Sequence, residues 1–124
     1  MSFSRRVLSS LLTLTATLAF SSAALAHAHL TQQTPAANAA LSEAPKALTL
    51  NFSEGVEQNF SKVVLLGPDD QPVATGKATL NASDDKQLLV PVNAPLKTGR
   101  YQVQWQVVSV DGHKTKGTYA FSIK

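Results

Sequence analysis

The stretch RYQVQWQVVSV, residues 100–110, alternates apolar and polar side chains along most of its length. Tyr101, Val103, Trp105 and Val107 fall on one face, and three glutamines occupy the positions between them. Successive side chains of a β-strand point to opposite faces, so this period of two predicts a strand that is buried on one side. Trp105 is at the centre of that face, where we expect it to be a core residue rather than a ligand-stacking one.

Similar apolar patterns precede and follow this strand. We predict strands in ALTLNFS (47–53), SKVVLLG (61–67), KQLLVPV (86–92) and GTYAFSIK (117–124), with a weaker one in ATGKATL (74–80). Turn residues such as GPDDQP (67–72) separate them, residues 34–45 read as a connector, and Pro91 suggests an edge or a bulge. No stretch after residue 26 has a helical period. Short strands at this spacing predict an all-β, antiparallel β-sandwich.

The first 26 residues have the pattern of a secretory signal peptide. Arg5 and Arg6 precede an apolar stretch from residue 7 to residue 20, and Ala24-Leu25-Ala26 is a small-x-small cleavage pattern. The apolar stretch is short for a membrane span of about 20 residues. We therefore expect cleavage after Ala26, export from the cytoplasm, and a mature domain of residues 27–124.

The composition of the mature domain limits its function. Removal of residues 1–26 from the 124-residue chain leaves 98 residues, enough for one small domain. The loss of two arginines lowers the formal charge from +3 to about +1, so nothing indicates a nucleic-acid surface. The chain has no cysteine, which excludes thiolate ligands and cysteine nucleophiles, and its one methionine is Met1.

The histidines are the strongest candidates for metal ligands. After cleavage, His27 would carry both a free α-amine and an imidazole, which can close a chelate on one ion. Asp111 and His113 are two residues apart, so in an extended segment both project to one side. Three nitrogens and a carboxylate suit tetragonal Cu(II), with tetrahedral Zn(II) as the second choice.

Two alternatives remain open at this point. Asp111-Gly112 is a typical hairpin dipeptide, so the segment could be a polar turn with no ligand role. His27-Ala28-His29 could instead wrap Cu(II) with the amine, two deprotonated amides and the imidazole of His29. We favour the cross-strand set because strand pairing competes for those amides, and His29 is then a neighbour of the site.

Three segments resemble the CopC family of periplasmic copper-binding proteins, in particular its short YobA-type members. They are AHAHL at the predicted cut, residues 35–57 with the strand end NFSE, and GRYQVQWQVVSVDGHKTKGTYAFSIK (99–124). The resemblance implies a Greek-key β-sandwich or barrel of about seven strands, immunoglobulin-like or cupredoxin-like. It also implies a Cu(II) site formed by His27, Asp111 and His113, with Glu54 either in a second shell or as a solvated strand end.

The same resemblance implies a periplasmic, monomeric protein that acts in copper sequestration, transport or resistance with a CopD-type inner-membrane partner. We do not expect it to be an enzyme. Several family members hold Cu(I) in a methionine-rich loop, but the central segment 65–86 has no methionine or histidine, so we expect no dedicated Cu(I) site. The alternatives are a copper-dependent oxidase or monooxygenase that uses the same histidine brace, and a metal-free immunoglobulin-like interaction module.

Overall fold

The computed structural model describes residues 27–124, and the predicted signal peptide lies outside the described residues. This part of the chain is built of strands and one 3-10 turn, η1 (Gln58–Phe60). The strands in chain order are β1 (Leu30–Thr34), β2 (Ala40–Leu41), β3 (Ala47–Phe52), β4 (Lys62–Leu66), β5 (Thr79–Asn81), β6 (Asp84–Pro91), β7 (Gly99–Val108) and β8 (Lys114–Ile123). The all-β prediction is confirmed.

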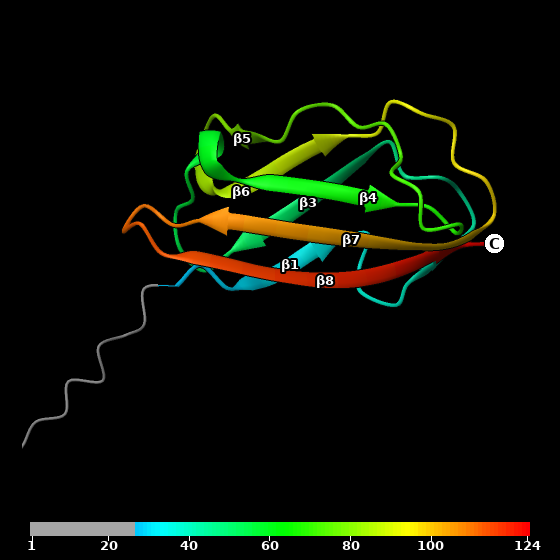
Figure 1. Ribbon diagram of the computed structural model, residues 1–124, viewed down its shortest axis with the longest axis horizontal. Coiled ribbons are helices and arrows are strands. Elements are labelled where there is room, and N and C mark those ends of the chain that lie inside the picture. Colours follow the sequence, from blue (N-terminus) through cyan, green and yellow to red (C-terminus); the bar gives the residue numbers. More distant parts are fainter. Residues whose placement is uncertain (1–26) are drawn as a thin grey trace, which may run out of the picture.

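The strands form two four-stranded sheets that pack face to face (Figure 1). One sheet has the order β1-β3-β6-β5 and the other has the order β2-β8-β7-β4. Neighbouring strands run antiparallel, except that the short β2 runs parallel to β8. The chain therefore forms the predicted β-sandwich.

The core lies between the sheets and is made by the apolar positions of the alternating strands. The four apolar residues of β7 that share a face are buried, as are Leu48, Leu50 and Phe52 of β3. The indole of Trp105 packs edge-on against the ring of Phe52, with ring centroids 5.2 Å apart. Trp105 is therefore a core residue, as the alternation predicted.

The connector and the weakest strand differ from the prediction. Residues 34–45 contain the two-residue strand β2, which is too short to produce a periodic signal. The predicted strand at 74–80 is reduced to β5, and most of the predicted stretch precedes it as a loop. Pro91 is the last residue of β6 and lies beyond the part that β5 covers, so its missing N–H interrupts no ladder there.

The β7–β8 hairpin brings one end of the sandwich together with the start of the described chain. Its two strands pair without a register shift from Gly99↔Ile123 to Val108↔Lys114. Figure 1 shows the hairpin turn and the first described residues at the same end of the molecule. The predicted ligands His27, Asp111 and His113 therefore lie at the same end of the sandwich.

A matched pair of phenylalanines tests the assignment of the core. Phe121 is completely buried, whereas Phe60 is 68% exposed. We expect Phe121→Ala to lower the free energy of unfolding by about 3–5 kcal/mol, because it removes a large buried ring and leaves a cavity. Phe60→Ala should change it by less than about 0.5 kcal/mol. Urea unfolding measures both, and equal losses would contradict this core.

Candidate metal centre

The imidazoles of His27 and His113 lie next to each other, although 85 residues separate them in the sequence. Their ring centroids are 4.6 Å apart and the ring planes are perpendicular. Two side chains hold the first residues in place: Thr115 Oγ1 donates to the carbonyl of Ala28 at 2.8 Å, and Ser53 Oγ donates to the carbonyl of His27 at 3.3 Å. The start of the described chain is thereby fixed to β8 and to the end of β3.

The turn between β7 and β8 holds Asp111 and His113 together. The Nδ1 of His113 lies 2.9 Å from Oδ2 of Asp111, and the backbone N–H of His113 donates to Oδ1 at 3.3 Å. Gly112 lies between them with φ at +87°, a conformation that glycine adopts without steric cost. The sequence prediction of an Asp-Gly hairpin turn is therefore correct, and the turn also aligns the carboxylate with the imidazole.

The carboxylate of Asp111 is stabilised in its ionised form. The Oγ of the buried Ser109 donates a hydrogen bond to Oδ1 of Asp111, and this contact together with the bonds from His113 lowers the pKa of Asp111 to about 2. Hydrogen bonds to a charged carboxylate favour that form over the neutral acid. At neutral pH the carboxylate is therefore available as a metal ligand or as the acceptor that orients His113.

The Nδ1 atom of His27 is buried and has no hydrogen-bond partner within residues 27–124. A buried polar nitrogen without a partner is uncommon, because it loses its contact with water and gains nothing in exchange. Coordination to a metal ion would satisfy this lone pair. This nitrogen is also the one that could form a chelate with an α-amine on the same residue.

His29 lies on the surface beside His27, and the centroids of their rings are 6.4 Å apart. Its backbone N–H donates to Oγ of Ser53 at 2.9 Å, and its carbonyl accepts from the N–H of Ser53 at 2.8 Å. Ala28 is completely buried. A wrap around Cu(II) would need the deprotonated amides of Ala28 and His29, so it would have to break this pairing.

Glu54 is exposed, and no contact with the histidines is recorded for it. Its neighbour Ser53 instead contacts both His27 and His29. Sequence analysis also assigned no role to Ser109 and Thr115, which fix Asp111 and Ala28. Ser109 lies two residues before Asp111 and Thr115 lies two residues after His113. The contacts that their hydroxyl groups make depend on the fold, so residue type alone did not identify them.

Side chains alone do not complete a metal site in this part of the chain. Residues 27–124 contain no group of three or more His, Cys, Asp or Glu side chains arranged to hold an ion. Oδ2 of Asp111 contacts Nδ1 of His113. Because these two atoms contact each other, the side chains of His27, Asp111 and His113 do not present three separate donors to one ion. A complete set would need a main-chain donor.

Within residues 27–124, no helix is long and apolar enough to cross a membrane.

Comparisons with known proteins find a matching family and several relatives of this chain. A family model described as the CopC domain matches residues 30–124. The chain is 59% identical over 99 residues to Protein YobA of Escherichia coli strain K12, covering 80% of each chain. It is 35% identical over 111 residues to Copper resistance protein C of Xanthomonas campestris pv. juglandis, covering 84% of this chain and 85% of that one.

Solved structures show the same fold. CopC from Methylosinus trichosporium OB3b superposes with a TM-score of 0.74 at 30% identity, covering 79% of this chain and 94% of that one. PcoC, described as a methionine-rich copper resistance protein from Escherichia coli, gives a TM-score of 0.70 at 36% identity, covering 80% and 100% of the two chains.

Replacement of Ser109 should remove the hydrogen bond that stabilises the ionised carboxylate of Asp111. We expect Ser109→Ala to raise the pKa of Asp111 from about 2 toward the ordinary value of 3.8, because its largest stabilising contact is lost. A pKa lowered by folding stabilises the native state above about pH 3.8, and this contribution is lost as the pH falls through about 2. Carboxyl-carbon NMR titration of the metal-free protein measures the pKa.

Ser53→Ala is the matched control, since Ser53 contacts the carbonyl of His27 but has no recorded contact with Asp111. In the Ser53→Ala variant, the pKa of Asp111 should be the same as in the parent protein. An unchanged pKa in the Ser109 variant would remove that serine from the support of the site.

Proposed function

The chain belongs to the CopC family, and from this premise we propose that it binds one Cu(II) ion through His27, Asp111 and His113. We further propose that it is a periplasmic protein of copper sequestration, transport or resistance. Two of the relatives it resembles are named Copper resistance protein C, which supports a role in handling copper.

The close approach of His27 and His113 is the observation that carries the proposal. A metal–imidazole bond is about 2 Å long, so one ion can bridge two rings whose centroids are 4.6 Å apart with small side-chain rotations. The buried and unpartnered Nδ1 of His27 supplies one of these nitrogens. Both rings come from segments that backbone and hydroxyl contacts hold in place, so little ordering is needed when the ion binds.

The α-amine of His27 supplies the main-chain donor if the chain is cut after Ala26. A free α-amine has a pKa of about 8, so a metal ion displaces its proton readily near neutral pH. The amine and Nδ1 of the same residue then chelate the ion. A nitrogen-rich set with one carboxylate favours Cu(II), which also has the highest affinity in the divalent series.

Asp111 can serve this site in either of two ways. Its Oδ2 can bind copper directly, which requires it to exchange the contact with His113 for a bond to the metal. Alternatively, Nδ1–H of His113 keeps donating to the carboxylate, and Nε2 of His113 faces the ion, as is common for histidine ligands oriented by a carboxylate. We place Asp111 in the ligand set, and its replacement by asparagine distinguishes the two arrangements.

We propose that the protein carries copper rather than using it for catalysis. A carboxylate in the coordination plane leaves less room for oxygen than a site built from two histidines alone, which argues against a monooxygenase. A CopD-type inner-membrane protein is the proposed exchange partner of the monomeric, exported domain. The domain has no thioether in residues 27–124, so the proposal includes no dedicated Cu(I) site.

Two histidine replacements test the ligand set against the N-terminal wrap. We expect His113→Ala to weaken Cu(II) binding by roughly 100-fold or more, because loss of a supporting contact alone costs about 10–100-fold. His29→Ala, the matched control, should leave the affinity within about threefold of the parent. A competition titration of the processed protein with a chelator of known affinity measures both. The reverse ranking would favour the His27-Ala28-His29 wrap.

Asp111→Asn tests the place of the carboxylate. If Asp111 binds copper, removal of its charge should weaken binding and shift the electron paramagnetic resonance parameters of Cu(II), because an oxygen donor is changed. A weaker affinity with an unchanged spectrum would restrict Asp111 to orienting His113.

A further inference from the structure

The outer edge of β8 has no strand partner along its first half. The short β2 pairs only with Ser122 and Ile123, and the carbonyl of Ala120 accepts from Asn38 on the same edge. Backbone groups alternate in direction along a strand, so the N–H and C=O groups of Lys116 and Thr118 face this edge as well. No strand of residues 27–124 pairs with them there.

A cleft of about 580 Å³ lies inside this edge, between β8 and β1. Trp105 and Tyr119 line it and are 9% and 8% exposed. The indole nitrogen of Trp105 and the hydroxyl of Tyr119 are both buried and without a hydrogen-bond partner in the described chain. Burial also raises the pKa of Tyr119 to about 12, so the hydroxyl keeps its proton. Both donors lack an acceptor, and both belong to residues that line the cleft.

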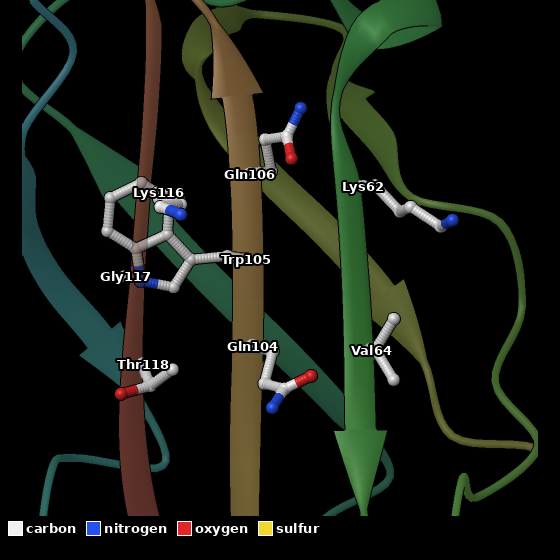
Figure 2. Close-up of a pocket in the computed structure, with 8 residues that line it drawn as sticks. All are labelled: Lys62, Val64, Gln104, Trp105, Gln106, Lys116, Gly117 and Thr118. Carbon is white, nitrogen blue, oxygen red and sulfur yellow. The ribbon is translucent and has the colours of Figure 1, made fainter.

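The solvent-exposed face of the sheet that contains β8 is basic. The strands of this sheet contain four cations, Lys62, Arg100, Lys114 and Lys116, and no acidic residue. Lys62 and Lys116 both pair with Gln106, which places them in one row across three strands. Figure 2 shows these lysines on either side of the glutamines of β7, with the indole of Trp105 over Gly117. The one ion pair recorded within residues 27–124 joins His113 and Asp111, so these cations have no carboxylate partner there.

We propose that the outer edge of β8 binds an extended acidic segment of a partner protein as an added strand. Its backbone would pair with Lys116 and Thr118, as in other cases where a peptide extends a sheet. Residues opposite Lys114 and Lys116 would project onto the basic face, where acidic side chains fit. The residue between them would project into the cleft beside Trp105 and Tyr119. A polar side chain there could accept a hydrogen bond once either ring turns to expose its donor. The recognised pattern is acidic-polar-acidic.

Charge makes an acidic partner the better occupant than a second copy of this chain. Lysines on an edge strand discourage pairing with an identical edge, because like charges would then face one another. The same lysines favour a strand that carries carboxylates. The cleft also reaches Ala28 and His29 at its end, so the bound segment would lie beside the first residues of the mature domain.

Binding of the synthetic peptide acetyl-TETETET-amide tests the proposal. We expect the amide signals of Lys116 and Thr118 and the indole N–H signal of Trp105 to shift saturably in nitrogen–proton NMR spectra of the processed protein. Thr118→Pro removes one outward N–H and should weaken binding about three- to tenfold. Lys116→Glu reverses one charge and should weaken it about fivefold or more.

Lys77→Glu is the matched control, because it makes the same change on an exposed loop before β5 and should leave binding unchanged. The lysine peptide acetyl-TKTKTKT-amide should not bind. Equal binding of both peptides, or shifts confined to the face around Gln104 and Gln106, would overturn the added strand. So would sedimentation of the protein alone as a dimer that blocks the edge. Thermal unfolding of each variant separates misfolding from loss of binding.

Discussion

The pairing of β7 with β8 is the constraint on which the rest of this structure depends. Their register places Trp105 opposite Gly117 and turns the chain so that Asp111 and His113 project beyond the end of the sheet. A slip of β8 by one residue against β7 would turn the buried side chains of β8 to solvent and its exposed side chains into the core. It would also move Thr115, whose hydroxyl anchors the carbonyl of Ala28, away from the first described residues. Core packing and the candidate metal centre therefore rest on one hairpin.

Buried polar atoms without hydrogen-bond partners lie in two places within residues 27–124. In the described residues these atoms are Nδ1 of His27, Nε1 of Trp105 and the hydroxyl of Tyr119. The first belongs to a proposed copper ligand, and the other two belong to residues that line the cleft beside β8. Leaving such atoms unpaired destabilises a fold, so each is better explained by something that binds there than by packing alone. The two places adjoin at Ala28 and His29.

Sequence periodicity was sufficient for the sandwich but not for the details of the site. Strict alternation in residues 100–107 identified the buried face of β7, and the Asp-Gly dipeptide identified the turn. The two-residue β2 was not predicted because so short a strand carries no period, and β5 was predicted only as a weaker strand over 74–80. The roles of Ser53 and Ser109 come from contacts made across strands or within the turn, which residue type alone does not specify. For Glu54 we expected either a second-shell role or a solvated strand end, and the structure places this side chain on the surface.

The central claim is that the liberated amine of His27 binds the copper ion together with the ring of His113. Electron paramagnetic resonance of the protein that begins at His27, selectively labelled with nitrogen-15 at the His27 α-amine, tests it most directly. With one equivalent of Cu(II), we expect hyperfine coupling to the labelled nitrogen and to the imidazoles, and loss of the amine coupling when one alanine is added before His27. Coupling patterns that are identical in the two proteins would contradict the claim.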